Sequence, residues 1–236
     1  MPFAEADGPT NMARDEALMS IAAQGHPVLR FYTWNPPTVS LGYFQPHSVR
    51  RYHPALEALP FVRRSSGGMT LVHDHELTYA LALPEKLISD QHSVWITRMH
   101  QVIAEALDGL GIPSELAHSP GEGTQDCLCF KHITPGHILI QSHKVVGSAQ
   151  RKTRKILLQH GGILLEQSDS TPSLPGIREL TGMELEPRFL SKKIVDLLLA
   201  KWNWRMVAQE WTEEYRNEVQ EIKAEKYLQS GWNEKR

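Results

Sequence analysis

The sequence predicts an α+β fold in which a mixed, mostly antiparallel central sheet is flanked by helices. Three observations lead to this expectation. Short apolar runs typical of strands cluster in the middle of the chain, segments with helical periodicity alternate irregularly with them, and no internal repeat is present. The 236 residues are 41% hydrophobic and 22% charged, as in ordinary globular proteins, and suffice for one large domain or a domain with a small appendage.

Five segments carry helix signals. The first begins at Asn11, a candidate N-cap, and stops before Gly25. The clearest one places its apolar side chains on one face and ends before Pro113. The last has a narrow apolar stripe on an otherwise charged helix. The expected helices are residues 11–24, 53–59, 92–110, a segment around 190–198, and 212–228.

Strand signals fill the region between the first and last helices. A turn at Asn35-Pro36-Pro37 predicts a hairpin between the first two strands. The apolar runs 156–158 and 163–165 are expected to be separate, because Gln159, His160, Gly161 and Gly162 lie between them. The expected strands are residues 28–34, 38–45, 61–64, 69–73, 77–83, 138–140, a segment opening at 144, 156–158 and 163–165.

Composition excludes several classes of protein. The net charge of −2 offers no basic excess for nucleic acid, and no apolar run reaches the length of a membrane span. The first ten residues are acidic and polar, unlike a signal peptide. Cys127 and Cys129 lie too close together to form an ordinary disulfide. We therefore expect a reduced, cytoplasmic protein that binds neither nucleic acid nor a membrane.

The stretch from Lys144 to Gln150 is the first candidate site. Lys144 supplies a cation, and Gly147, Ser148 and Ala149 allow a ligand to approach the backbone closely. His160 and Gly161 lie on an adjoining segment, where polar groups could reach the same place. The alternative is a sheet with a surface lysine and a bulge, and a structural role for the histidine.

A second candidate site joins two arginines to a small flexible loop. Arg63 and Arg64 precede Ser65, Ser66, Gly67 and Gly68. Guanidinium groups hold carboxylate or phosphate bidentately, and glycine lets backbone N–H groups face an anion. The alternative is a hairpin turn with exposed arginines.

The run His73-Asp74-His75-Glu76 concentrates ionisable side chains. A His-x-His pair can ligate a metal, but no further ligand lies at conventional spacing, so we expect a hydrogen-bonded turn and no metal site.

The pair Cys127 and Cys129 has three interpretations. It could be half of a metal site, although Cys-x-Cys lacks the usual gap and a partner pair. Both thiols could be buried and inert. Or one is a nucleophile, because a nearby cation such as Lys144 would favour the reactive thiolate. In a strand the two side chains would face the same way.

Together these motifs resemble the lipoate-protein ligase and octanoyltransferase family, over nearly the whole chain and in the same order. The motifs that carry the resemblance are residues 11–18, 30–37, 41–45, 63–68 with His73-Asp74, 144–150, 158–161, and 226–227 with 232–236. The resemblance implies a biotin protein ligase-like fold, related to class II aminoacyl-tRNA synthetases. It implies a single catalytic domain over residues 1–236, with a connector at 167–188 and a C-terminal helical segment at 189–236.

The resemblance also implies chemistry. Lys144 matches the family lysine beside the acyl carbonyl, and Cys129-Phe130 resembles the octanoyltransferases of the ligase-like branch, whose nucleophile is a cysteine. Cys127 has no counterpart. Ligases usually have three glycines in their loop, whereas this chain has Gly67-Gly68-Met69-Thr70. The alternatives are an ATP-dependent lipoate ligase, a lipoyl amidotransferase, and a non-catalytic ligand-binding protein on the same scaffold.

The expected reaction moves an octanoyl or lipoyl group from acyl carrier protein to a lysine of a lipoyl domain or a glycine cleavage H-type protein. Cys129 and Lys144 are the expected catalytic residues. The ligase alternative alone would need ATP and Mg²⁺; otherwise no cofactor is expected. The residues expected to bind substrate are Arg63, Arg64, Ser66, Gly67, Gly68, His73, Gly147, Ser148, Ala149, His160 and Gly161.

Overall fold

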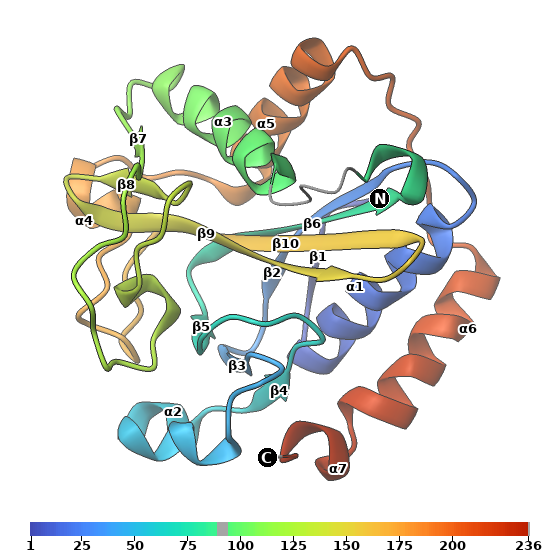
Figure 1. Ribbon diagram of the computed structural model, residues 1–236, viewed down its shortest axis with the longest axis horizontal. Coiled ribbons are helices and arrows are strands. Elements are labelled where there is room, and N and C mark those ends of the chain that lie inside the picture. Colours follow the sequence, from blue (N-terminus) through green and yellow to red (C-terminus); the bar gives the residue numbers. More distant parts are fainter. Residues whose placement is uncertain (89–93, 236) are drawn as a thin grey trace.

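The computed structural model describes residues 1–88 and 94–235, and its centre is a seven-stranded sheet with helices on both faces (Figure 1). Neighbouring strands are antiparallel except β1 and β2, which are parallel. The strands, in their order across the sheet, are β1 (Ala4–Ala6), β2 (Val28–Trp34), β6 (Glu76–Pro84), β10 (Ile156–Leu164), β9 (His143–Lys152), β8 (Ile138–Ile140) and β7 (Glu115–Leu116). The predicted α+β fold is confirmed.

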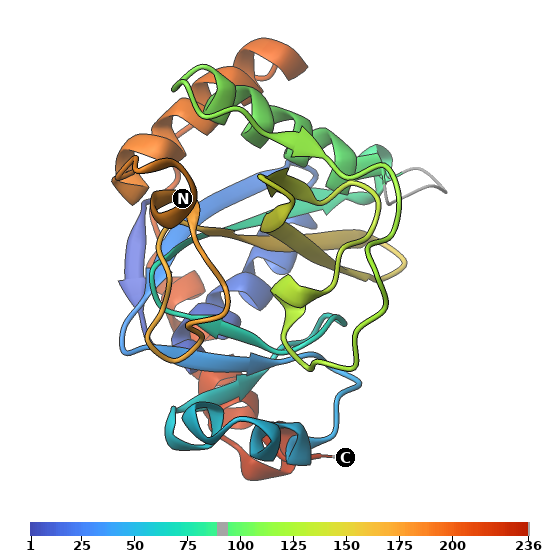
Figure 2. The same cartoon turned by 90° about the vertical axis from the view of Figure 1, so that its left-hand side faces the viewer.

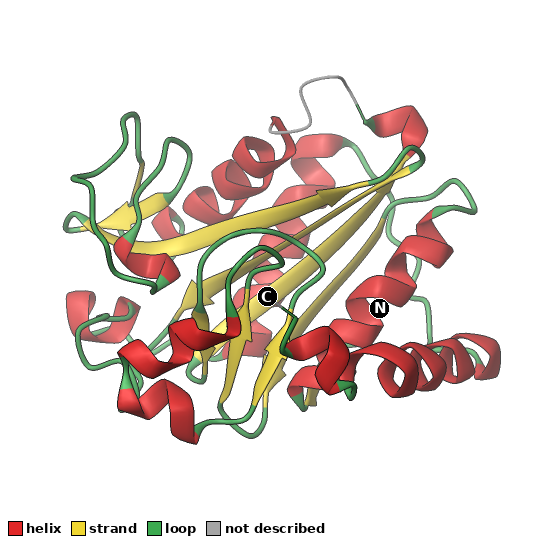
Figure 3. Cartoon of the chain, turned by 60° about the horizontal axis from the view of Figure 1, so that its bottom comes forward, coloured by secondary structure: helices red, strands yellow, loops and turns green. Residues whose placement is uncertain are grey.

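A three-stranded sheet lies beside the large one, and Figure 3 shows its short strands in front of the long ones. It consists of β4 (Phe61–Arg63), β3 (Thr38–Leu41) and β5 (Leu71–His73), with β3 in the middle. The predicted hairpin between the first two strands is therefore wrong. Both edges of β2 are already occupied, by β1 and β6, so the chain leaves the large sheet at the prolines and β3 pairs elsewhere.

Two pairs of helices cover the two faces of the large sheet (Figure 1). On one face α3 (Val94–Asp108) packs against α5 (Pro187–Trp202), and on the other α1 (Gly8–Ala22) packs against α6 (Glu213–Ile222). Each pair has its own apolar core against the sheet. The predicted start of α3 at His92 lies outside the described residues, and so does Arg236.

Short helices complete the chain, and Figure 2 shows the first of them at the lower end of the molecule. They are α2 (Pro54–Ala58), α4 (Ile177–Thr181) and α7 (Ser230–Asn233), with a π-helical turn at Lys223–Tyr227 between α6 and α7. No helix in the described ranges is both long and apolar enough to cross a membrane.

Helix α1 begins earlier than the sequence predicted. Its N-cap is Asp7, whose carboxylate accepts the Thr10 N–H at 2.7 Å. Asn11 is buried inside the helix, and its side-chain amide donates to the carbonyls of Ala6 at 3.0 Å and Thr33 at 3.1 Å. The polar residue that resembled a cap therefore ties the helix to the edge of the large sheet.

Residues 156–164 form one continuous strand, so the predicted break at Gln159–Gly162 is wrong. Pairing with β6 and β9 continues through all four of these residues. Their polar groups are satisfied inside the fold, since the Gln159 amide donates to the Tyr79 hydroxyl at 2.8 Å. Buried polar side chains with distant partners thus interrupt the apolar pattern without interrupting the strand.

The structure shows which elements lie within residues 167–188, the predicted connector. It contains α4 and the first residues of α5, which begins at Pro187. Its turns are fixed by side chains, for example by Ser168 Oγ donating to Asp74 Oδ2 at 2.7 Å. The C-terminal segment, predicted to be helical, does contain α6 and α7, and Val219 of its predicted stripe is buried against α1.

Candidate active site

The structure brings the two predicted catalytic residues together. Cys129 opens a 3₁₀ turn over Cys129–Lys131, and its backbone N–H donates to the Thr70 carbonyl at 2.7 Å. Lys144 lies near the start of β9, and its Nζ is 3.6 Å from Cys129 Sγ. The same Nζ donates to the carbonyls of Cys129 and His132, both at 2.9 Å. The ammonium group therefore fixes the turn and places a cation beside the sulfur.

Lys144 is buried, with 4% of its surface exposed. Burial lowers the pKa of Lys144 because it penalises the ammonium form, while the Cys129 thiol opposes this shift. Its side chain runs across Gly147, where a Cβ would come within 2.6 Å of Lys144 Cε. A side chain at position 147 would therefore displace the end of the lysine from the position in which it donates to the carbonyls of Cys129 and His132.

A cavity beside Cys129 collects most of the predicted substrate-binding residues. Those that line it are Cys129, Arg64, Gly68, His73, Gly147, Ser148, Ala149, His160 and Gly161. Six further residues line it that were not predicted from the sequence: Met12, Tyr32, Trp34, Leu71, Thr78 and Gly162. Tyr32 and Trp34 alternate along β2 and so face the same side of the sheet, which was the available signal.

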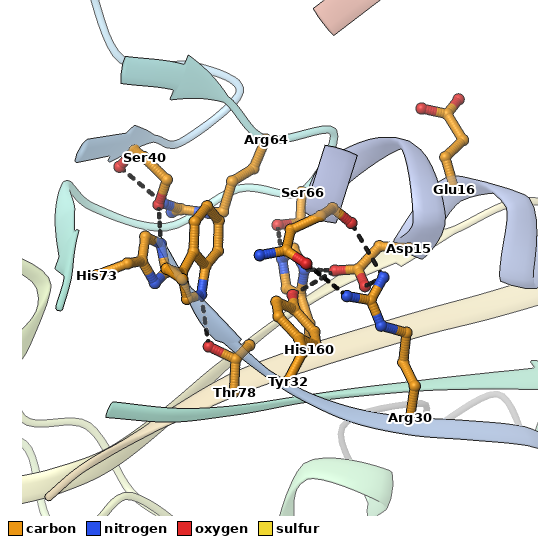
Figure 4. A network of polar contacts seen from close by, with 12 residues as sticks. Asp15, Glu16, Arg30, Tyr32, Ser40, Arg64, Ser66, His73, Thr78 and His160 are labelled. Atoms are coloured by element: carbon orange, nitrogen blue, oxygen red, sulfur yellow. Dashed lines mark hydrogen bonds and ion pairs between the residues drawn. The ribbon is translucent and has the colours of Figure 1, made fainter. Parts of the chain in front are cut away.

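On one side of the cavity, His160 connects a serine to an aspartate (Figure 4). Its Nε2 lies 2.5 Å from Ser66 Oγ and its Nδ1 lies 3.0 Å from Asp15 Oδ2. The Tyr32 hydroxyl donates to the same carboxylate oxygen at 2.8 Å, and Arg30 pairs with Asp15 at 3.3 Å. All of these residues are buried.

His73 holds an equivalent position between Ser40 and Glu76. Its Nε2 lies 2.6 Å from Ser40 Oγ, and its Nδ1 is hydrogen-bonded to Glu76 Oε1. The ring stacks on Trp34 with centroids 3.7 Å apart. Burial lowers the pKa of His73, although Glu76 opposes this shift.

The two histidines have a common consequence for the cavity. Both nitrogens of each ring are engaged with protein partners, so His73 and His160 present carbon atoms to the space that they line. Trp34 donates its indole N–H to Thr78 Oγ1 at 2.8 Å in the same way. A lining rich in polar residue types therefore offers mainly apolar surface, which suits an aliphatic ligand.

Ser148 is held from the other face of the sheet. Its hydroxyl lies 2.6 Å from the Tyr79 hydroxyl and 2.6 Å from His100 Nε2. Burial lowers the pKa of His100 to about 4, so this histidine is neutral at pH 7. These contacts fix β9 from the side opposite the cavity, behind residues 147–149, which line it.

The two arginines of the predicted anion site have different surroundings. Arg63 does not line the cavity, and its guanidinium donates to the carbonyls of Gly42 at 2.9 Å and Gln45 at 2.6 Å. Arg64 does line it, while donating to Ser40 and to the carbonyls of Gly67 and Met69. Both are buried, so the alternative of a turn with exposed arginines is wrong.

Gly67 lines a second cavity, of about 410 Å³, whereas its neighbour Gly68 lines the first. The remaining lining residues are Tyr43, Phe44, Ser65, Gln150, Arg151, Lys226 and Trp232. Ser66 lines neither cavity and reaches the first through its hydrogen bond to His160.

The two cysteines do not face the same way, because the chain leaves the extended conformation at Cys129. Cys129 lines the cavity. Cys127 is buried in a separate apolar cluster with Val49 and Leu56. Burial raises the pKa of the Cys127 thiol, which makes it less reactive.

Gly161→Ala should disrupt this site. A Cβ at Gly161 would lie 2.7 Å from the Gly147 carbonyl oxygen and 2.7 Å from the Tyr79 ring, so β9 and β10 would have to separate. We expect the free energy of unfolding to fall by about 1–3 kcal/mol, measured by urea denaturation. Gly123→Ala is the control, since its Cβ would meet nothing within 4 Å. Equal stability of both variants would contradict this account of Gly161.

Comparison with known proteins decides the family. Residues 7–173 match the family model described as the lipoyl protein ligase A/B catalytic domain, which is more than half of the chain. The chain belongs to the lipoyl protein ligase A/B family. Its relatives in this family include the octanoyltransferase LipM of Kyrpidia tusciae, 31% identical over 94% of this chain and 93% of the relative. Another is LipM of Clostridioides difficile, 30% identical over 98% and 96%.

The fold is likewise that of the lipoyl protein ligase A/B family. A crystal structure of lipoate-protein ligase A bound with ATP superimposes with a TM-score of 0.77 at 18% identity, covering 98% of this chain and 96% of the other. At that identity the likeness concerns the fold alone. The resemblance inferred from the sequence motifs is confirmed.

Proposed function

We propose that this protein is an octanoyltransferase that passes an octanoyl group through a thioester on Cys129 to a lysine of a lipoyl domain. The observation that carries the proposal is the position of Cys129 Sγ, 3.6 Å from Lys144 Nζ, in a cavity with mainly apolar lining. The names of the relatives at 30–31% identity over nearly the whole chain support it. Residues 1–236 act as one catalytic domain in this proposal.

In the first step Cys129 attacks the thioester carbonyl of octanoyl-acyl carrier protein. A bond forms between Sγ and the carbonyl carbon, the bond to the carrier sulfur breaks, and the carrier leaves as a thiol once it takes up the proton lost by Cys129. Lys144 favours the thiolate and stabilises the negative charge that develops on the carbonyl oxygen. The backbone N–H groups near Gly147 and Ser148 are further donors for this oxygen.

In the second step the acceptor lysine attacks the octanoyl-Cys129 thioester. The new amide bond forms as the bond to Sγ breaks, and the proton lost by the amine restores the Cys129 thiol. Two steps with lower barriers thus replace one direct transfer. The acceptor is a lipoyl domain or a glycine cleavage H-type protein, and the octanoyl chain lies along the walls formed by His73, His160 and Trp34.

The ligase alternative rests on the shared fold, because a solved structure of that fold contains ATP. Cys129 distinguishes the two functions, since a ligase activates the free acid with ATP and needs no nucleophilic sulfur. In the proposed reaction Arg64 and His73 fix the walls of the cavity and no cofactor takes part.

We expect transfer from octanoyl-acyl carrier protein to proceed at the same rate with EDTA and without ATP. The measurement is the mass of a lipoyl domain after incubation with octanoyl-acyl carrier protein, with free lipoate plus ATP and Mg²⁺, or with another lipoyl-bearing protein. If lipoylation from free lipoate plus ATP and Mg²⁺ were as fast as transfer from the carrier thioester, the protein would be a lipoate ligase. Transfer from one lipoyl-bearing protein to another, faster than from the carrier, would identify an amidotransferase.

A further inference from the structure

Three side chains of different chemistry converge outside the acyl cavity. His53 precedes α2, and Asp126 and Cys127 precede the turn that carries Cys129. One ligand atom from each of the three lies within 4.8 Å of the other two. His53 Nε2 and Asp126 Oδ1 are 3.5 Å apart. The two segments are more than 70 positions apart in the sequence, so their spacing along the chain could not reveal the group.

The distances and the atom types fit one class of metal. In tetrahedral zinc, nitrogen and oxygen ligands lie about 2.1 Å from the ion and therefore about 3.4 Å from each other, close to the separation of His53 and Asp126. A thiolate, an imidazole and a carboxylate form a ligand set that zinc accepts, whereas magnesium and calcium require oxygen ligands. The sulfur lies within 4.8 Å of the other two ligand atoms, and tetrahedral zinc would need about 3.6 Å, so a shift of at most about 1 Å completes three tetrahedral positions.

The surroundings hold the ligands in place. Asp126 Oδ1 accepts the Leu128 N–H at 2.9 Å, and the Asp126 carbonyl lies 2.6 Å from His132 Nε2. Cys127 is 6% exposed in an apolar cluster, while the side chains of His53 and Asp126 are 40% and 23% exposed. The group therefore has a buried sulfur side and an open side that faces water, from which an ion can enter.

We propose that His53, Asp126 and Cys127 form a zinc-binding site with one coordination position left for water. The bound ion joins the segment around α2 to the start of the Cys129 turn. The site is separate from the Cys129–Lys144 pair and does not depend on the acyl-transfer chemistry. It gives Cys127 a role that neither the family resemblance nor the proposed reaction supplies.

Cobalt(II) titration of the full-length protein tests the site, because a cobalt–thiolate bond produces a charge-transfer absorption band. We expect one equivalent of cobalt to produce the band and one equivalent of zinc to remove it. Cys127→Ser and His53→Gln should each lose the band or weaken cobalt binding by more than about tenfold.

Two control variants make the assignment specific. Cys129→Ala removes the other cysteine, and His75→Gln removes an exposed histidine outside the proposed site, which pairs with Asp74 at 3.7 Å. Both should keep the band. Absence of the band in the unmodified protein, its survival in Cys127→Ser or at full affinity in His53→Gln, or its loss in Cys129→Ala would each overturn the proposal. Circular dichroism of each variant shows that it is folded.

Discussion

Replacing Cys129 with alanine is expected to abolish the octanoyl adduct and to slow transfer by about three orders of magnitude or more. Sγ of Cys129 is the sulfur that lines the cavity beside the Lys144 ammonium, and without it no acyl-enzyme forms. The measurement is intact mass after incubation with octanoyl-acyl carrier protein, followed by the rate of lipoyl-domain modification. Cys129→Ser should also fail, because serine places a far less acidic hydroxyl there.

Cys127→Ala is the matched control for this experiment. It should keep both the adduct and transfer, with a modest loss of stability because the side chain is buried in an apolar cluster. Iodoacetamide should label Cys129 faster than Cys127, whose burial raises its pKa. An adduct that persists in Cys129→Ala and disappears in Cys127→Ala would identify the other sulfur as the nucleophile. Activity in the double variant would exclude a cysteine mechanism.

Lys144→Ala is expected to lower transfer by about 10²–10³-fold, the usual effect of removing a group that stabilises charge in the transition state. Lys144→Arg should not restore the rate. The guanidinium is larger, stays protonated and presents a planar fork of donors, so it does not match the ammonium group that donates to the carbonyls of Cys129 and His132. The measurements are the single-turnover rate of adduct formation and the rate of alkylation of Cys129, both of which should fall.

Lys144 also donates to two carbonyls of the Cys129 turn, so its removal affects structure as well as charge. Lys144→Met separates the two effects, because methionine fills much of the same volume without a cation. We expect Lys144→Met to transfer the octanoyl group as slowly as Lys144→Ala does, and to unfold at a higher temperature than Lys144→Ala. A near-normal rate in Lys144→Met or Lys144→Arg would contradict a specific role for the amine.

Local sequence patterns correctly predicted those helices and strands that can be identified without knowing which other segments they contact. The strand at Val28–Trp34 was placed correctly, and the apolar face of α3 is the one buried in the core. The errors came from contacts between distant segments. The hairpin prediction was wrong because β1 and β6 already pair with both edges of β2. A turn signal in the sequence does not reveal which strands occupy those edges. The prediction of a break in β10 was wrong because the polar groups of Gln159 form hydrogen bonds with residues of β6 and β9.

The candidate site was predictable to a similar extent. Glycines and serines next to Lys144 and Arg64 indicated where backbone and ligand could approach, and these segments do line one cavity. The residues behind them were not predictable. Asp15 lies 145 positions from His160, its hydrogen-bond partner, and His100 lies 48 positions from Ser148. Such partners are chosen by the packing of helices onto the sheet, which leaves no trace in spacing along the chain.

The attachment of Arg63 to Trp232 and Asn233 affects the order in which the structure around Arg63 can be completed during synthesis. The Arg63 backbone N–H donates to Asn233 Oδ1 at 2.9 Å, and the Trp232 indole donates to the Arg63 carbonyl at 2.9 Å. Both partners are made about 170 residues after the arginine. The backbone of Arg63, which leads into residues 65–68 beside the cavity, therefore gains these two hydrogen bonds only after Trp232 and Asn233 have been made.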